Sequence, residues 1–110
     1  MTNKQLPVIF RKYPVESPLG DIVALFPTMP AETVGNDIVF VKCYEFDGKF
    51  IQQGTAYPQG LIRITKPATP EEYKKLMTEL HKIGYKNLKV CKRLLYKHLE
   101  KAKGTAKEYK

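Results

Sequence analysis

The sequence predicts an α+β fold: a small antiparallel meander sheet of about five or six strands, with one well-capped helix packed across it and a short basic C-terminal helix. Short apolar runs separated by turn residues predict the strands. The stretch Thr69–Tyr85 carries the strongest helix signals, and a lysine-rich segment follows it. At 110 residues we expect a single domain over residues 1–93, followed by a basic helix and tail over residues 94–110.

Three apolar runs predict the first strands. Val8–Phe10 is rich in β-branched and aromatic residues. Asp21–Phe26 is almost wholly apolar, which is typical of a strand covered on both faces. Asp37–Phe46 is the longest candidate and alternates between two faces. Between these last two, Pro27–Asn36 contains two prolines and a glycine, and we expect an irregular loop there.

Shorter strands are predicted in the second half of the chain. Asp47–Gly48 is a hairpin signal, so Lys49–Gln53 is expected to return beside the longest strand. Leu61–Thr65 alternates as a half-buried strand does. Asn87–Arg93 alternates in the same way and is expected to be the last strand.

The predicted central helix has a defined start, an apolar stripe and a defined end. Thr69 can cap the helix, Pro70 suits its first position, and Glu72 completes a capping box. Gly84 supplies a left-handed stop. The stripe recurs at steps of three and four residues and consists of Tyr73, Leu76, Met77, Leu80 and Ile83.

A second, shorter helix is predicted from about Leu94 to Lys103. Leu95, Leu99 and Ala102 fall at helical steps within it, and Gly104 ends it. Lysines occupy most of the intervening positions, which makes this helix basic.

Several segments in this order resemble a group of small uncharacterised proteins of phages and mobile elements of gut bacteria. These segments are VIFRK, ALFP, TKPATPEEY and IGY followed by a basic strand, so the resemblance covers roughly residues 8–93. The chain departs from the group at Tyr44–Gly54, which holds fewer aromatic, histidine and glycine residues, and at Leu94–Lys110, which is an extension. The resemblance implies an origin in a mobile element and carries over no activity.

Positive charge is concentrated in the C-terminal part of the chain. The formal net charge is +8, and residues 69–110 hold twelve Lys or Arg against five Asp or Glu, a net charge of +7. Within the central helix, acidic residues lie within helical reach of Lys74 and Lys75, so its outward face is nearly neutral. The excess therefore lies on Lys86–Lys103. A one-sided basic surface attracts polyanions.

The residues that carry chemistry in enzymes are sparse and scattered. His81 and His98 lie in lysine-rich helical stretches, with no carboxylate nearby in sequence to orient them. Cys43 and Cys91 match neither a disulfide framework nor a metal-site spacing, and we expect reduced thiols. We therefore expect a protein that is not an enzyme and has no catalytic residue, no metal site and no cofactor.

The chain also lacks the sequence signals of membrane insertion and secretion. No apolar run reaches the roughly 18 residues of a membrane span. The first residues do not have the three-part order of a secretory signal. We expect a soluble cytoplasmic protein without a membrane partner, in the cytoplasm of the host cell if a phage encodes it.

Nucleic-acid binding is the function that this pattern predicts first. Phosphate contacts need clustered Lys and Arg, and aromatic rings beside them can stack on bases. Because lysine outnumbers arginine, binding is expected to be directed at the phosphate backbone. The predicted contact residues are Lys86, Lys89, Lys92, Arg93, Lys97, Lys101, Tyr85 and Tyr96.

The alternative is a protein-interaction or inhibitor module that acts on a host or phage protein. The Pro27–Asn36 loop would then expose Met29 and Val34 to a partner. A homodimer is a second form of this alternative, because the strands carry more apolar surface than one helix can cover. The residues expected to form that surface are Phe40, Tyr44, Phe46 and Phe50.

Overall fold

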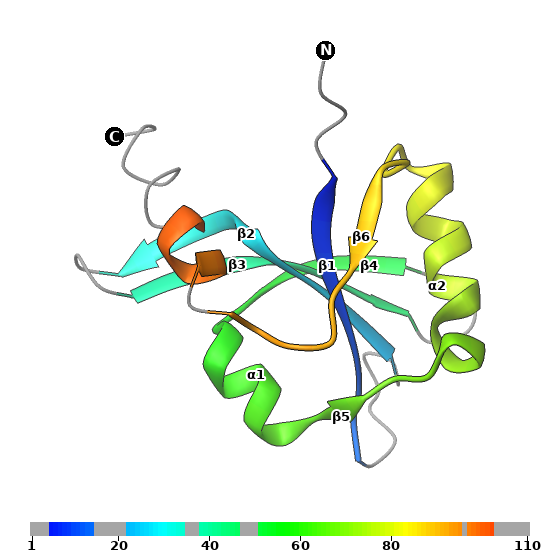
Figure 1. The fold of residues 1–110 in the computed structure, drawn as a ribbon, viewed down its shortest axis with the longest axis horizontal. Helices are drawn as coiled ribbons and strands as arrows, with labels where there is room; N and C mark the ends of the chain where they lie inside the picture. Colours follow the sequence, from blue (N-terminus) through cyan, green and yellow to red (C-terminus); the bar gives the residue numbers. More distant parts are fainter. Residues whose placement is uncertain (1–4, 15–21, 35–37, 47–50, 96, 103–110) are drawn as a thin grey trace.

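Four strands form an antiparallel meander at the centre of the molecule. The computed structural model describes residues 5–14, 22–34, 38–46, 51–95 and 97–102. The four strands are β1 (Leu6–Lys12), β2 (Ile22–Val34), β3 (Ile38–Phe46) and β4 (Ile51–Ala56). Each pairs with its neighbour along the chain, so the order across the sheet is β4-β3-β2-β1 (Figure 1). The predicted α+β meander is confirmed.

Two short strands extend the sheet along the free edge of β1. β5 (Lys66–Pro67) pairs antiparallel with the end of β1, at Arg11 and Lys12. β6 (Leu88–Val90) pairs with the start of β1, and this pair is parallel rather than antiparallel. The sheet is therefore mixed at this edge. A parallel neighbour requires a crossover connection, and the helix α2 (Pro70–Lys82) provides it between β5 and β6.

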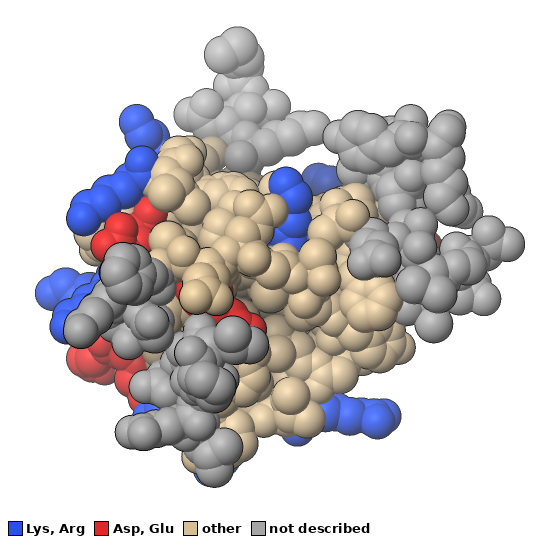
Figure 2. Space-filling model, turned by 180° about the vertical axis from the view of Figure 1, so that it is seen from behind, with Lys and Arg blue, Asp and Glu red and all other residues tan. Residues whose placement is uncertain are grey.

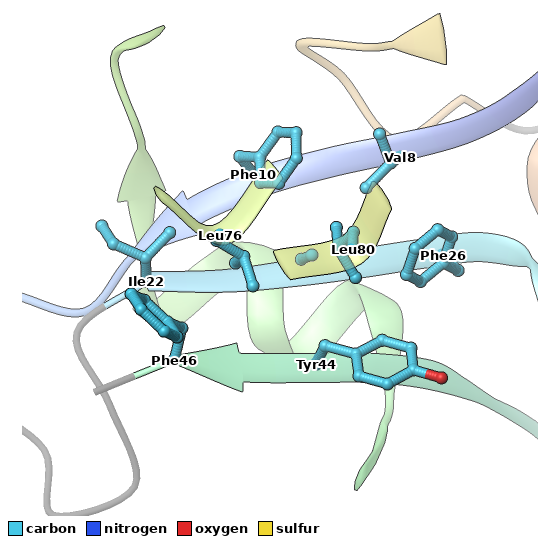
Figure 3. Packing of buried hydrophobic residues seen from close by; sticks show 9 residues of the cluster. Val8, Phe10, Ile22, Phe26, Tyr44, Phe46, Leu76 and Leu80 are labelled. Atoms are coloured by element: carbon cyan, nitrogen blue, oxygen red, sulfur yellow. The ribbon is translucent and has the colours of Figure 1, made fainter. Parts of the chain in front are cut away.

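The helix α2 covers one face of the sheet and closes the larger core. Leu76 and Leu80, one helical turn apart, are both 0% exposed and point at the strands (Figure 3). Phe10 stacks on Tyr73, with ring centroids 4.1 Å apart. The buried residues of this first core are Val8, Phe10, Ile22, Ala24, Phe26, Tyr44, Phe46, Leu76 and Leu80.

The opposite face is covered by two other helical segments. These are α1 (Pro58–Ile64) and a C-terminal helix at residues 97–102. Alternate residues of the strands point to this face, as the strand period of two requires. The second core consists of Ile9, Val23, Leu25, Val41, Cys43, Leu61 and Ala102. Ala102 in this core means that the C-terminal helix packs on the sheet.

The predicted start and end of α2 are confirmed. The Thr69 Oγ1 accepts a hydrogen bond from the Glu72 N–H, and the Glu72 Oε1 accepts one from the Thr69 N–H at 2.9 Å. Lys12 forms an ion pair with the Glu72 carboxylate, which ties the helix to β1. The Lys12 ammonium and the Thr69 N–H lower the pKa of Glu72 to about 2. Gly84 follows the helix at φ +117°, the left-handed region.

The prediction of a strand at Leu61–Thr65 is wrong, because these residues continue α1. Pro58 stands at the start of this helix, and Pro58 and Leu61, three residues apart, are its buried residues. Ile64, which the alternating pattern placed in a strand, is 61% exposed. A segment this short fits either period, and packing on the sheet decides between them.

The prediction of an irregular loop at Pro27–Asn36 is also wrong, because β2 continues to Val34. The pairing of β2 with β3 shifts register between Leu25 and Pro30 and again between Pro30 and Glu32. Such irregularities accept prolines, which have no N–H for a regular ladder. Met29 is half-buried and packs against the first core, so it is not the exposed residue that was expected.

The other predicted boundaries differ by a few residues. β4 runs to Ala56, beyond the predicted end at Gln53, and β6 covers the middle of the predicted Asn87–Arg93 strand. Residues 97–102 lie within the predicted second helix. The Asp47–Gly48 turn, Phe50, Tyr96 and Gly104 lie outside the described residues.

Candidate nucleic-acid interface

The basic segment that follows α2 is held against the edge of β1. The Asn87 carbonyl accepts a hydrogen bond from the Leu6 N–H, and the Cys91 N–H donates to the Val8 carbonyl, both at 2.8 Å. Leu88, between them, packs against the first core. Lys89 and Val90 remain exposed. The pairing of β6 with β1 thus fixes where the following lysines begin.

Tyr85 belongs to the core. Its ring stacks on Phe26 with centroids 4.9 Å apart, and its hydroxyl is 2.9 Å from the hydroxyl of Tyr44. The pKa of Tyr44 is raised to about 12, first because its hydroxyl is buried and then because this hydroxyl is hydrogen-bonded to Tyr85. The sequence predicted Tyr85 as an aromatic ring that stacks on bases beside the lysines, and in the structure this ring packs against the first core.

Residues 91–95 cross the face of the sheet that carries α1 and lead into the C-terminal helix (Figure 1). Cys91 and Leu94 pack against the second core along this path. The crossing brings the two ends of the basic segment together and leaves a hollow on either side. We name them the His98 hollow and the Arg11 hollow, each after a buried residue that lines it.

The His98 hollow, of about 630 Å³, collects three of the predicted lysines. Lys89 comes from β6, and Lys97 and Lys101 come from the C-terminal helix, one turn apart. Exposed Val90 and Leu95 and buried Thr28 also line it. Among the described residues, no Asp or Glu lines this hollow.

His98 itself is 4% exposed and has a defined tautomer. Its Nδ1 accepts a hydrogen bond from the Leu95 N–H at 3.1 Å, so the proton of the neutral ring is on Nε2. Burial lowers the pKa of His98, and the charges of Lys97 and Lys89 lower it further. The hollow therefore offers three ammonium groups and one neutral imidazole.

The Arg11 hollow, of about 670 Å³, lies beside α1 and collects four cations. Lys92 and Arg93 come from the crossing segment, Arg63 from the last turn of α1, and Arg11 from β1. Its other described lining residues are Gln59, Ile62, Pro67 and Leu94, and none of the described acidic side chains is among them.

Arg11 is the one residue of these hollows whose charge is buried, at 7% exposed. Its Nε donates to the Thr65 Oγ1 at 2.9 Å, and its Nη2 donates to the carbonyls of Thr65 at 2.6 Å and Ile62 at 3.0 Å. These acceptors lie at the C-terminal end of α1, where the helix dipole favours a cation. Burial lowers the pKa of Arg11 from its ordinary value.

The sequence prediction did not include Arg11 or Arg63. The signal for Arg11 was its spacing from Ile9, which places a charge on the strand face that is otherwise apolar. Of the predicted residues, the structure gathers Lys89, Lys97 and Lys101 in one hollow and Lys92 and Arg93 in the other. Lys86 lines neither hollow, and Tyr96 lies outside the described residues.

The described residues show no arrangement typical of a metal site. Among them, no group of three or more His, Cys, Asp or Glu side chains is placed to hold a metal ion. Cys43 is buried in the second core, and burial, followed by the Glu45 charge, raises the pKa of its thiol to about 11. The chemistry available in both hollows is the binding of anions by cations and N–H donors.

Within the described residues, no helix is long and apolar enough to cross a membrane. Charge on the α2 side of the molecule is mixed, with acidic and basic side chains lying next to one another (Figure 2). Comparison of the chain with protein-family models, with curated proteins and with solved structures finds no match.

Proposed function

We propose that the protein is a small non-enzymatic binding module that holds nucleic acid by its phosphate backbone. The binding surface is the pair of hollows on either side of residues 91–95, which we name the cationic surface. Its cations are Lys89, Lys97 and Lys101 in the His98 hollow and Arg11, Arg63, Lys92 and Arg93 in the Arg11 hollow.

One observation carries this proposal: seven cations from five separate parts of the chain line two neighbouring hollows, and none of the described carboxylates lines either hollow. On α2 the lysines are instead interleaved with glutamates, and Lys82 forms an ion pair with Glu79 at 3.7 Å. Net charge alone does not require this separation. A surface on which cations gather apart from the described carboxylates attracts phosphates and releases their counterions.

The expected binding mode is backbone contact with weak sequence preference. Four of the seven cations are lysines, which contact phosphate as point charges. Tyr85 is engaged in the core, so stacking by this ring is no part of the proposal. The resemblance to phage and mobile-element proteins supports the cytoplasm of a bacterial host as the setting of the proposed activity.

The test compares two triple variants that each lose three exposed lysines. One removes Lys89, Lys97 and Lys101 from the cationic surface; the other removes Lys74, Lys75 and Lys82 from α2, all to Ala. Labelled single- and double-stranded DNA and RNA are titrated at low and moderate salt. We expect the first variant to weaken binding at least tenfold and the second to weaken it far less. Equal losses, or no binding by the parent protein at low salt, refute the proposal.

A protein partner is the alternative, and it is favoured by the apolar exposure at the two ends of α1. Tyr57 is 42% exposed and Ile64 is 61% exposed. The apolar surface first expected of a homodimer is reduced, because Tyr44 and Phe46 are buried under α2. Capture from a nuclease-treated bacterial lysate tests this alternative. A stoichiometric protein that is retained by the parent and lost with Ile64→Asp supports it, and beads without such a protein argue against it.

A further inference from the structure

Arg11 is a buried cation whose hydrogen-bond partners among the described residues are all neutral. The three hydrogen bonds of its guanidinium go to one hydroxyl and two carbonyls. No carboxylate of the described residues forms an ion pair with it. Burying a charge is costly unless an opposite charge compensates it, and the dipole of a seven-residue helix offsets only part of that cost.

Counting its donors shows that one nitrogen of Arg11 remains available. A guanidinium has five N–H donors on three nitrogens. Nε and Nη2 make the three bonds described above, and Nη1 makes none with the described residues. No buried side-chain nitrogen or oxygen in the described structure is both unbonded and shielded from solvent, so Nη1 is open to solvent. Because Arg11 lines the Arg11 hollow, we take this opening to face the hollow.

The surroundings of Nη1 match the chemistry of a phosphate group. Arg63, Lys92 and Arg93 line the same hollow and are exposed, so their side chains are free to close on a ligand. Two of these three are arginines, and a guanidinium can donate two parallel hydrogen bonds to two oxygens of one phosphate. The volume of about 670 Å³ exceeds that of one phosphate, and Ile62 and Leu94 offer an apolar wall to an attached sugar or base.

We propose that the Arg11 hollow is a discrete pocket for one phosphate group, with Nη1 of Arg11 as its fixed donor and Arg63, Lys92 and Arg93 as its mobile donors. The proposal deepens the proposed function, since the phosphate would belong to the bound nucleic acid. The same chemistry is offered by an internal phosphodiester, a 5′-terminal phosphate and a free nucleotide. The pocket differs from the His98 hollow, which has lysines and no guanidinium.

The first experiment measures thermal unfolding in inorganic phosphate and in chloride at matched ionic strength. We expect phosphate to raise the midpoint in a saturable way. Replacing Arg63, Lys92 and Arg93 by Ala should weaken the response at least tenfold, whereas replacing Lys74, Lys75 and Lys82 of α2 by Ala should leave it unchanged. Equal midpoints in the two salts, or an unchanged response in the first variant, overturn the proposal.

Two further measurements distinguish phosphate binding by Arg11 from a purely structural role of this residue. Backbone amide shifts during a phosphate titration should move around Arg11, Arg63 and Arg93 and not around Lys74; movement elsewhere only overturns the pocket. Arg11→Lys keeps the positive charge but loses the planar set of N–H donors of the guanidinium. A folded variant should therefore bind phosphate at least tenfold more weakly. If Arg11 serves only to cap α1, phosphate has no effect on the parent protein, and that result also overturns the pocket.

The source of the phosphate is distinguished by three ligands. Tighter binding of a 5′-phosphorylated oligonucleotide than of its 5′-hydroxyl twin assigns the pocket to strand ends; equal binding of both, with competition by free phosphate, assigns it to the backbone. A mononucleotide that binds while oligonucleotides do not supports the pocket and refutes the proposed function. If oligonucleotides bind through Lys89, Lys97 and Lys101 and phosphate does not compete with them, the proposed function is supported and the pocket is refuted.

Discussion

The dependence of nucleic-acid affinity on salt gives the sharpest quantitative test of the cationic surface. Each neutralised phosphate of a single strand contributes about −0.7 to the slope of log Kobs against log salt concentration. If all seven cations of the two hollows contact phosphates, the slope for single-stranded DNA is about −5. Affinity should then fall about a thousandfold between roughly 50 and 200 mM KCl.

Removal of Lys89, Lys97 and Lys101 should make this slope shallower by about 2, because three contacts are lost. The assay is fluorescence anisotropy of a labelled oligonucleotide over a series of KCl concentrations. The triple Ala variant of Lys74, Lys75 and Lys82 is the control, since it changes net charge equally. The reasoning is refuted if the parent slope is near zero, or if the two variants change the slope by the same amount.

Three other predictions concern the elements that position the surface. Tyr85→Phe removes the hydrogen bond between the hydroxyls of Tyr85 and Tyr44, and should cost about 1 kcal/mol in the free energy of unfolding by urea while leaving nucleic-acid affinity unchanged; a loss of affinity without a loss of stability would restore this ring as a contact. Thr69→Ala removes the hydroxyl of the capping box and should cost about 1 kcal/mol, measured in the same way, whereas Thr69→Ser should cost much less. Because the pKa of His98 lies below 6.5 in the folded protein, the unfolded chain takes up the proton first as pH falls, so stability that is complete above pH 6.5 declines below it, by at most about 1.4 kcal/mol per pH unit. His98→Gln should flatten this decline in urea titrations between about pH 7.5 and 5.5, and an unchanged decline would assign it to another group.

Elements whose signals lie within one short stretch of the chain could be predicted from the sequence. The start of α2 follows from three neighbouring residues. Thr69 and Glu72 satisfy each other's backbone N–H groups, and Pro70 suits the first helical position. Its apolar stripe identifies Leu76 and Leu80 as core residues, because the helical period places them on one face. The meander follows equally from apolar runs and short connections, and the concentration of charge after α2 is a matter of composition.

The remaining elements depend on contacts between residues that are far apart in the chain, which only the tertiary structure shows. The strand predicted at Leu61–Thr65 is the end of α1, which Arg11 caps from a position 54 residues away from Thr65. The prolines of β2 are accommodated by register shifts that exist only in its pairing with β3. In these cases the local pattern fits two structures, and burial against a distant element selects one.

The candidate site divides in the same way. The sequence located Lys89, Lys92, Arg93, Lys97 and Lys101, since a run of basic residues is visible as such. It placed Tyr85 with them, and only the packing on Phe26 moved this ring into the core. It could not join Arg11 and Arg63 to Lys92 and Arg93, because β1, α1 and the crossing segment meet only when both faces of the sheet are covered. Charge is a property of composition, whereas a pocket is a property of the fold.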